Sequence, residues 1–430
     1  MSKKPDPVES ALTRARGLIR HLAGAIKDKF DYSSMAMMFS REEYGGLLLD
    51  SADVREYQAT YTLLCDAIGD EYVVSRRTID SALQTAILSA INPRGASPDR
   101  DFETRLDDAI ATLRKALGEK LRSFVVFFPV EGLEKDGLPA ETGPVTWCLF
   151  DGPHYERFNL AAKCHRVSEE QVVRQRLIHK FAADNPKQVF ARVVVEARDY
   201  GASLRQARLK VSRVIDVINF FSDMAPYSHG WLYLPSEGEP RAVTSAVIES
   251  EGESFSFIGH RHGPLTKLSL SALREADSKQ NLGFKRALQL VADQQATLAK
   301  QLTAAICWAG RARAEPRREQ AFLLFAIALE SAVLPEQSNE ELTYRLRIRV
   351  AHLLGRTVSE RADLSKRVRE LYRIRSKIVH TGHLDVSETR LAEIRALAKR
   401  CIVRLLQDDE FNVMRNKEQL QVWFEAVVLR

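Results

Sequence analysis

From about residue 270 to the end of the chain, apolar residues recur three and four positions apart almost without interruption. That spacing places them on one face of an α-helix, and helices with such a face bury it against one another. The C-terminal part of the chain is therefore predicted to be a bundle of helices. No apolar run in the chain reaches the ~18 residues that a membrane-spanning helix needs, so we expect no membrane partner.

The middle of the chain has a different pattern, in which β-branched and aromatic residues form short runs between Gly and Pro. These runs predict strands at 123–130, 145–150, 189–197, 230–234, 242–248 and 254–258. Helical spacing predicts helices at 11–30, 57–68, 79–91, 102–121, 168–183 and 201–221. The predicted fold class is α+β, with a helical region at 1–120, an α+β region and candidate sensor or regulatory domain at 121–275, and a helical domain at 285–430.

Basic residues are concentrated near the C-terminus. The chain has 63 Lys and Arg against 57 Asp and Glu, a net charge of +6. From residue 301 onward we count 23 basic and 17 acidic residues, and within 341–380 we count 11 and 4. A local basic excess favours a polyanionic partner, although a solvated helix face gives the same count.

The cysteines are odd in number and widely separated: Cys65, Cys148, Cys164, Cys307 and Cys401. Together with an N-terminus that lacks an apolar signal segment, this favours a cytoplasmic protein with reduced thiols. A zinc site would need ligands spaced as in known fingers, and the nearest candidates do not match that spacing: Cys148, His154, Cys164 and His165. No metal and no cofactor are expected, and a metal-dependent enzyme built on residues 120–265 is kept as a minor alternative.

One polar residue interrupts an apolar stripe in the predicted helix 360–379. The apolar members of that stripe are Leu364, Val368, Leu371 and Ile378. Arg375 takes the remaining position, where a guanidinium is costly to bury unless it is paired. Glu330, at the margin of the apolar face of helix 320–334, is the carboxylate predicted to pair with it. A purely structural ion pair is one interpretation of these two residues, and a functional site is the other.

Signals at the ends of helices place the neighbouring polar residues. Gly382 is suited to end helix 360–379 in a left-handed cap, so His380 falls in or just beyond its final turn. The preceding helix, 339–354, opens with the capping-box pattern Ser338-x-x-Glu341. Three arginines are interleaved with its apolar stripe: Arg345, Arg347 and Arg349.

Residues 375–380, RSKIVH, match the R-x4-6-H signature of HEPN domains. The wider stretch 371–382, LYRIRSKIVHTG, resembles the motif helix of the ApeA-like branch of that family, and so does Ala-Leu-Glu at 328–330. The ordered set of these motifs carries the resemblance, which covers about residues 300–410. Residues 1–270 resemble no family that we recognise.

The resemblance to HEPN ribonucleases implies a helical bundle that dimerises and cleaves RNA without a metal. Arg375 and His380 of two protomers would then meet in one cleft as the catalytic residues. Five positions apart on an ideal helix, they lie about 140° apart and ~7.5 Å along the axis. A two-fold interface would bring each residue near its symmetry mate. ApeA-like relatives are associated with antiphage defence, so the resemblance implies an antiviral, abortive-infection or toxin effector.

Several neighbours are expected to assist this pair. Lys377 and the three arginines of helix 339–354 would hold the RNA backbone, unless they belong to a solvated face. Tyr372 would stack on a base or pack within the bundle, Ser376 would orient the site, and Glu330 would support Arg375. HEPN toxins that are paired with nucleotidyltransferase antitoxins have a tyrosine two residues after the histidine. Gly382 stands there in this chain, so control by modification of that tyrosine is not expected.

Two function classes follow from these observations. The first is a homodimeric endoribonuclease whose residues 1–270 respond to a phage-derived trigger or a regulatory protein. The second is a catalytically inactive HEPN module that binds RNA or only dimerises. Retention of both Arg375 and His380 favours the enzyme, because an inactive domain has no chemical reason to keep the pair.

Overall fold

The computed structural model describes residues 6–25, 35–41, 45–68, 73–91, 101–118, 120–149, 189–224, 230–234, 242–248, 255–261, 267–293, 296–334, 342–382 and 385–428. The chain divides into two compact units, Met1–Val126 with Val194–Arg208, and Phe127–Val193 with Leu209–Arg430. Helices dominate both units and one four-stranded sheet accompanies them, so the predicted α+β class is confirmed. The two observed units have other boundaries than the three predicted regions and do not test them. The predicted domain boundaries near 120 and 275–285 therefore stay predictions.

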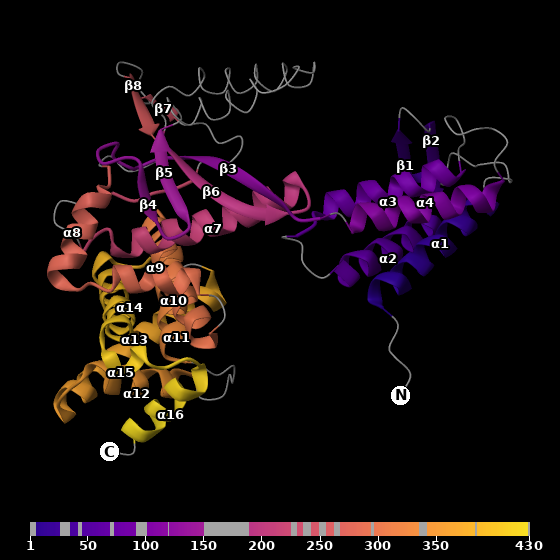
Figure 1. Ribbon diagram of the computed structural model, residues 1–430. Helices are drawn as coiled ribbons and strands as arrows, with labels where there is room; N and C mark the ends of the chain where they lie inside the picture. The colour runs from indigo at the N-terminus through magenta and orange to yellow at the C-terminus, as the bar shows by residue number, and fades with distance from the viewer. Residues whose placement is uncertain are drawn as a thin grey trace. The chain divides into compact units, whose positions relative to one another are not determined.

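The first unit is built on four helices, α1 (Pro7–Ala25), α2 (Ser51–Ile68), α3 (Arg76–Ile91) and α4 (Phe102–Leu117), which Figure 1 shows side by side. Their apolar faces meet in one core, in which Leu83, Ile87 and Leu106 are fully buried. Helix α4 begins at Asp101, whose carboxylate accepts the N–H of Thr104 at 2.9 Å. Helical spacing in the sequence therefore predicted these helices correctly in type.

A β-hairpin in this unit was not predicted. Strand β1 (Met35–Arg41) pairs antiparallel with β2 (Gly45–Asp50), within a region expected to be mostly helical. Neither strand contains Val, Ile or Thr, so both lack the β-branched signal used to recognise strands. The hairpin ends at Asp50, which accepts the N–H groups of Ala52 and Asp53 and so starts α2.

The four-stranded sheet has the order β3-β6-β5-β4. Its strands are β3 (Arg122–Val130), β4 (Ala140–Thr142), β5 (Val145–Leu149) and β6 (Val189–Ala197). Strand β5 pairs antiparallel with both β4 and β6. Three of these strands were predicted, and so were helix α7 (Tyr200–Phe221) and the antiparallel pair β7 (Ala242–Ile248) and β8 (Phe255–Arg261). The predicted helix 168–183 lies outside the described residues.

The predicted strand 230–234 is wrong. Only Tyr233 forms a bridge there, with Glu131. The backbone of Leu232 is instead bonded at both its N–H and its C=O to the side-chain amide of Asn219, at 2.7 and 2.9 Å. A side chain of α7 thus satisfies the groups that a neighbouring strand would have satisfied.

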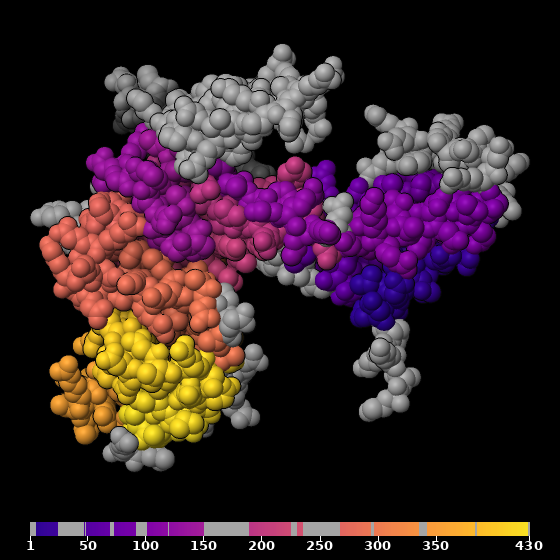
Figure 2. Space-filling view, in the orientation of Figure 1, coloured from indigo at the N-terminus to yellow at the C-terminus, as the bar shows by residue number. Residues whose placement is uncertain are grey.

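The C-terminal helices belong to the second unit, where Figure 1 shows them gathered into a bundle. They are α8 (Leu270–Gln280), α9 (Phe284–Ala292), α10 (Thr297–Ala314), α11 (Arg318–Val333), α12 (Leu342–Leu354), α13 (Val358–Thr381), α14 (Glu388–Gln407), α15 (Asp409–Asn412) and α16 (Lys417–Val428). Helix α11 packs against α10, α13 and α14 and buries Phe322, Phe325 and Leu329 completely. In Figure 2 the yellow atoms of the last helices form one surface with the orange atoms of the helices before them. The predicted helical bundle is confirmed.

Helices α7 and α10 cross at a glycine. A Cβ atom added to Gly310 would lie 1.9 Å from the backbone oxygen of Asp216. We expect Gly310→Ala to lower the free energy of unfolding by at least about 2 kcal/mol, because two backbones must separate to admit the methyl group. Urea unfolding followed by circular dichroism measures this. Gly17→Ala is the control: nothing lies within 4 Å of its Cβ, so a gain of up to about 1 kcal/mol is expected. An unchanged unfolding curve for Gly310→Ala would contradict the crossing.

Candidate functional site

Helix α13 carries most of the predicted site residues, and both of its ends are capped. At the start, the Thr357 hydroxyl accepts the N–H of Glu360, and the Glu360 carboxylate accepts the N–H of Thr357, each at 3.2 Å. At the end, Gly382 has φ 70° and donates its N–H to Ile378 O at 3.0 Å. The glycine cap is confirmed, whereas the capping box lies just ahead of the predicted start and was missed.

The interrupted apolar stripe of α13 faces the bundle as predicted. Its apolar members are buried: Leu364, Val368, Leu371 and Ile378. Arg375 keeps 33% of its side-chain surface and reaches Glu330 of α11, with 3.5 Å between Nε and Oε1. The predicted pairing of these two residues is confirmed, in a site that is only partly closed to solvent.

Glu330 also binds a second side chain of α13. The Tyr372 hydroxyl donates to the same Oε1 atom that faces Arg375. Burial, followed by the Glu330 charge, raises the pKa of Tyr372, so this hydroxyl stays protonated and acts as a donor. With its ring buried and its hydroxyl bound inside, Tyr372 packs within the bundle and does not offer a stacking surface to a base.

His380 lies about 140° around the axis of α13 from Arg375 and about 80° from Tyr372. It is exposed, as are Ser376 and Lys377, which share its helix face one turn earlier. Among the described residues, none forms a hydrogen bond or an ion pair with the His380 imidazole. Within one chain, therefore, Arg375 points to the margin of the bundle and His380 points to solvent.

The three arginines of α12 differ from one another. Arg349 is buried, with 7% of its surface exposed, and its Nη1 donates to Val333 O at 3.2 Å. Val333 is the last residue of α11, so Arg349 satisfies a carbonyl that has no partner within that helix. Its guanidinium also lies 5.1 Å from the centre of the Phe424 ring. The prediction that Arg349 binds RNA is therefore wrong.

Arg345 and Arg347 are half-buried. The Arg347 guanidinium lies over the ring of Tyr344, at 5.1 Å from its centre. Burial, with a smaller effect of the Arg349 charge, lowers the pKa of Arg345. Both retain some exposed surface, so they stay in the predicted RNA-binding set.

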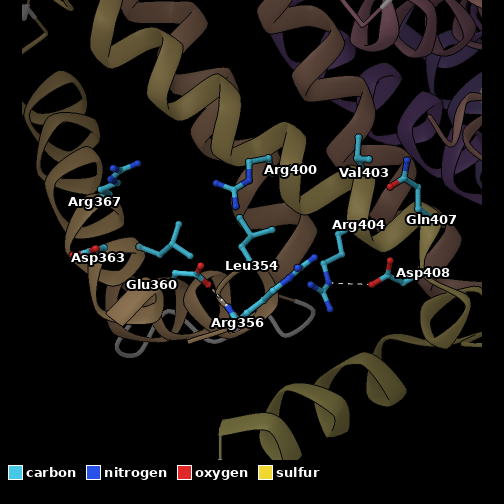
Figure 3. A pocket seen from close by; sticks show the side chains of 11 residues that line it. Leu354, Arg356, Glu360, Asp363, Arg367, Arg400, Val403, Arg404, Gln407 and Asp408 are labelled. Carbon is cyan, nitrogen blue, oxygen red and sulfur yellow. Dashed lines mark hydrogen bonds and ion pairs between the residues drawn. The ribbon is translucent and has the colours of Figure 1, made fainter. Parts of the chain in front are cut away.

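A surface pocket that the sequence did not reveal opens between α13 and α14 (Figure 3). Its volume is about 630 Å³, and four arginines line it: Arg356, Arg367, Arg400 and Arg404. They come from the loop before α13, from α13 itself and from α14. The spacing of Arg400 and Arg404, one turn apart on one helix, was the only local signal for it.

The metal-site candidates gain no support from the described part of the chain. Cys148 is buried in β5, whereas His154, Cys164 and His165 lie outside the described residues. Within the described ranges, no three side chains of His, Cys, Asp or Glu are grouped so that they could hold a metal ion. None of the described helices combines the length and the apolar character that crossing a bilayer requires.

Comparison with protein-family models, curated proteins and solved structures finds no match to this chain. The resemblance to HEPN domains thus rests only on the sequence motifs quoted above.

The buried contact between Tyr372 and Glu330 can be tested through stability. Tyr372→Phe removes the hydroxyl and leaves the carboxylate without this donor, so the free energy of unfolding should fall by about 1–2 kcal/mol. Tyr344→Phe removes the same atom from a tyrosine that is 52% exposed, and little change is expected. Urea unfolding of both variants gives the comparison. Equal losses in the two variants would show that the Tyr372 hydroxyl does not stabilise the bundle.

Proposed function

We propose that this protein is an endoribonuclease that cleaves RNA without a metal at a site shared by two copies of the chain. One observation carries the proposal: an accessible imidazole, His380, lies in the last turn of the helix on which the partly exposed Arg375 is held by Glu330. A guanidinium fixed by an ion pair is pre-organised for an anionic group, and an imidazole open to solvent is available for proton transfer. The HEPN resemblance of these same residues supports the proposal.

The chemistry uses the ribose 2′-hydroxyl as the nucleophile. One imidazole removes the 2′-hydroxyl proton while the 2′-oxygen bonds to the adjacent phosphorus. The bond from phosphorus to the 5′-oxygen breaks, and a second imidazole gives its proton to that leaving oxygen. Guanidinium groups stabilise the charge on the phosphoryl oxygens. The products are a 2′,3′-cyclic phosphate and a 5′-hydroxyl, and DNA is inert because it lacks the nucleophile.

The geometry of α13 explains why two copies are needed. Arg375 and His380 are about 140° apart around the helix axis, so one chain cannot direct both at one phosphate. A two-fold axis beside the end of α13 would bring two imidazoles and two guanidiniums around it. Exposed Lys377 would hold a neighbouring phosphate and Ser376 would orient the site, with Arg345 and Arg347 as further contacts.

The proposed setting follows from the resemblance. ApeA-like relatives are associated with antiphage defence, and we propose a cytoplasmic effector of that kind. Residues 1–270 would then bind the phage-derived trigger or regulatory protein that controls the nuclease.

A second candidate function is a module that binds RNA or dimerises without cleaving. The ion pair between Arg375 and Glu330 favours it, because that contact gives Arg375 a structural task that needs no substrate. The two functions differ in the role of His380, since among the described residues no hydrogen bond or ion pair engages its imidazole.

Cleavage is tested with labelled tRNA and mRNA in EDTA. His380→Ala should lower the cleavage rate by at least about 100-fold, because it removes the general acid and base. Arg375→Ala should also lower the rate, and His21→Ala, at an exposed histidine of α1, should not. Equal cleavage by the wild type and His380→Ala would rule out the proposed chemistry. RNA binding without cleavage, unchanged in His380→Ala, would support the second function.

The shared site predicts a dominant effect when subunits are mixed. A dimer of one wild-type chain and one His380→Ala chain has a single imidazole, so excess mutant chain should suppress wild-type cleavage after subunit exchange. The rate at a fixed wild-type concentration is measured against added mutant. A rate that does not fall as mutant chain is added would contradict a composite site.

A further inference from the structure

The pocket between α13 and α14 presents four arginines, and three of them have no ion-pair partner among the described residues. Its apolar residues include Leu354, at the end of α12, and Leu364, on the inner face of α13. Figure 3 shows Arg367 of α13 and Arg400 of α14 extending toward each other across the opening, with Arg356 reaching toward Arg404. Three separate segments therefore direct guanidinium groups into one space of about 630 Å³.

The carboxylates of the pocket neutralise only part of this charge. Asp408 forms an ion pair with Arg404, with 3.1 Å between Nε of the arginine and Oδ2 of the aspartate. Glu360 is held by the backbone N–H groups of Arg356 and Thr357. These bonds and, to a smaller extent, the nearby charges of Arg356 and Arg400 lower the pKa of its carboxyl. The third carboxylate, Asp363, is exposed and has no hydrogen bond or ion pair within the described residues.

The remaining arginines are open to solvent and to a ligand. Arg356, Arg367 and Arg400 are all exposed, and the described part of the chain gives none of them an ion-pair partner. Guanidinium groups bind phosphate through paired N–H donors, which makes arginine well suited to this anion. None of the residues that line the pocket is aromatic, so it lacks a surface on which a base could stack.

We propose that this pocket binds phosphate groups of an RNA backbone, at a site separate from the proposed catalytic residues. The inference rests on the proposed function, since it assigns the substrate of that nuclease a second point of contact. Several guanidinium groups that point into one space can bind successive phosphates of an RNA backbone. The absence of aromatic residues from the lining means that the bases are not held by stacking there. A free oligophosphate shares this chemistry and is the other source to be tested.

The position of the pocket on α13 suits a strand that leaves the proposed cleavage site. Arg367 lies eight residues before Arg375, which is ~12 Å along the helix axis and about 80° around it. The pocket is thus nearer to the Arg375 side of α13 than to the His380 side. In the proposed dimer, RNA that passes Arg375 of one chain can continue along that chain to its own pocket.

The test measures RNA binding in a His380→Ala background, so that no cleavage interferes. Fluorescence anisotropy of a labelled 12-nucleotide single-stranded RNA gives the Kd at salt concentrations between about 50 and 200 mM. Over that range the affinity falls with a slope that depends on the number of phosphate contacts. Combining Arg367→Gln with Arg400→Gln should raise the Kd at least about tenfold. The slope of log affinity against log salt should fall by about 1.4, the value for two lost contacts with a single strand.

Matched variants distinguish the effect of losing the pocket arginines from the effect of losing positive charge elsewhere on the surface. Lys366→Gln with Arg369→Gln removes the same charge from exposed positions of α13 that do not line the pocket, and a change below about twofold is expected. Asp363→Asn removes the unpaired carboxylate and should tighten binding. Equal weakening by the two double variants, with melting curves that show both to be folded, would overturn the inference.

Further arms distinguish the possible failures. Tripolyphosphate should compete with RNA for the wild-type pocket and not for the Arg367 and Arg400 variant. Tripolyphosphate binding that depends on these arginines, with RNA binding that does not, would overturn RNA in favour of a free oligophosphate. Cleavage by the wild type with no role for the pocket would overturn this inference alone. Pocket-dependent RNA binding without cleavage would overturn the proposed nuclease and leave the RNA contact standing.

Discussion

The Glu330 carboxylate joins α11 to α13 through two side chains, and the rest of the candidate site depends on that contact. Oε1 accepts the Tyr372 hydroxyl and faces the Arg375 guanidinium, which lie three residues apart on α13. Two attachments on one helix face fix its rotation as well as its distance. With α13 turned this way, the face that carries Ser376, Lys377 and His380 is left exposed.

Some arginines of this bundle hold the fold together and others line an open pocket. A count of basic residues in the sequence does not distinguish the two groups. Arg349 binds the end of α11 from inside, and Arg311 of α10 pairs with the buried Asp216 of α7 at 3.0 Å. Arg367 and Arg400 instead are exposed and line a surface pocket. The basic excess of residues 341–380 thus overstates the charge available to a polyanion, because part of it replaces backbone hydrogen bonds within the core.

Features set by neighbours in sequence could mostly be predicted, and features set by distant partners mostly could not. Helix faces and the Gly382 cap follow from spacing. The pairing of Arg375 with Glu330 is an exception, because the cost of burying a charge requires a carboxylate from elsewhere in the fold. The burial of Arg349 depends on Val333 O and Phe424, which belong to other helices. The arginine pocket likewise draws its lining from residues between 354 and 408, and apart from the spacing of Arg400 and Arg404 no local pattern marks that set.

The arrangement of α13 bears on what kind of substrate the two surfaces could share. From Arg367 to His380 the helix axis extends ~20 Å, and the two residues lie about 140° apart around it. A single phosphodiester cannot span that separation, so a ligand that engages both must be an extended polymer that wraps around the helix or passes between protomers. A two-fold partner would shorten the path of the ligand. The second copy of His380 would lie beside Arg375 of the first chain, which is closer to the pocket of that chain than its own His380 is. The same dimer that the proposed chemistry requires would therefore also connect the pocket with the cleavage site.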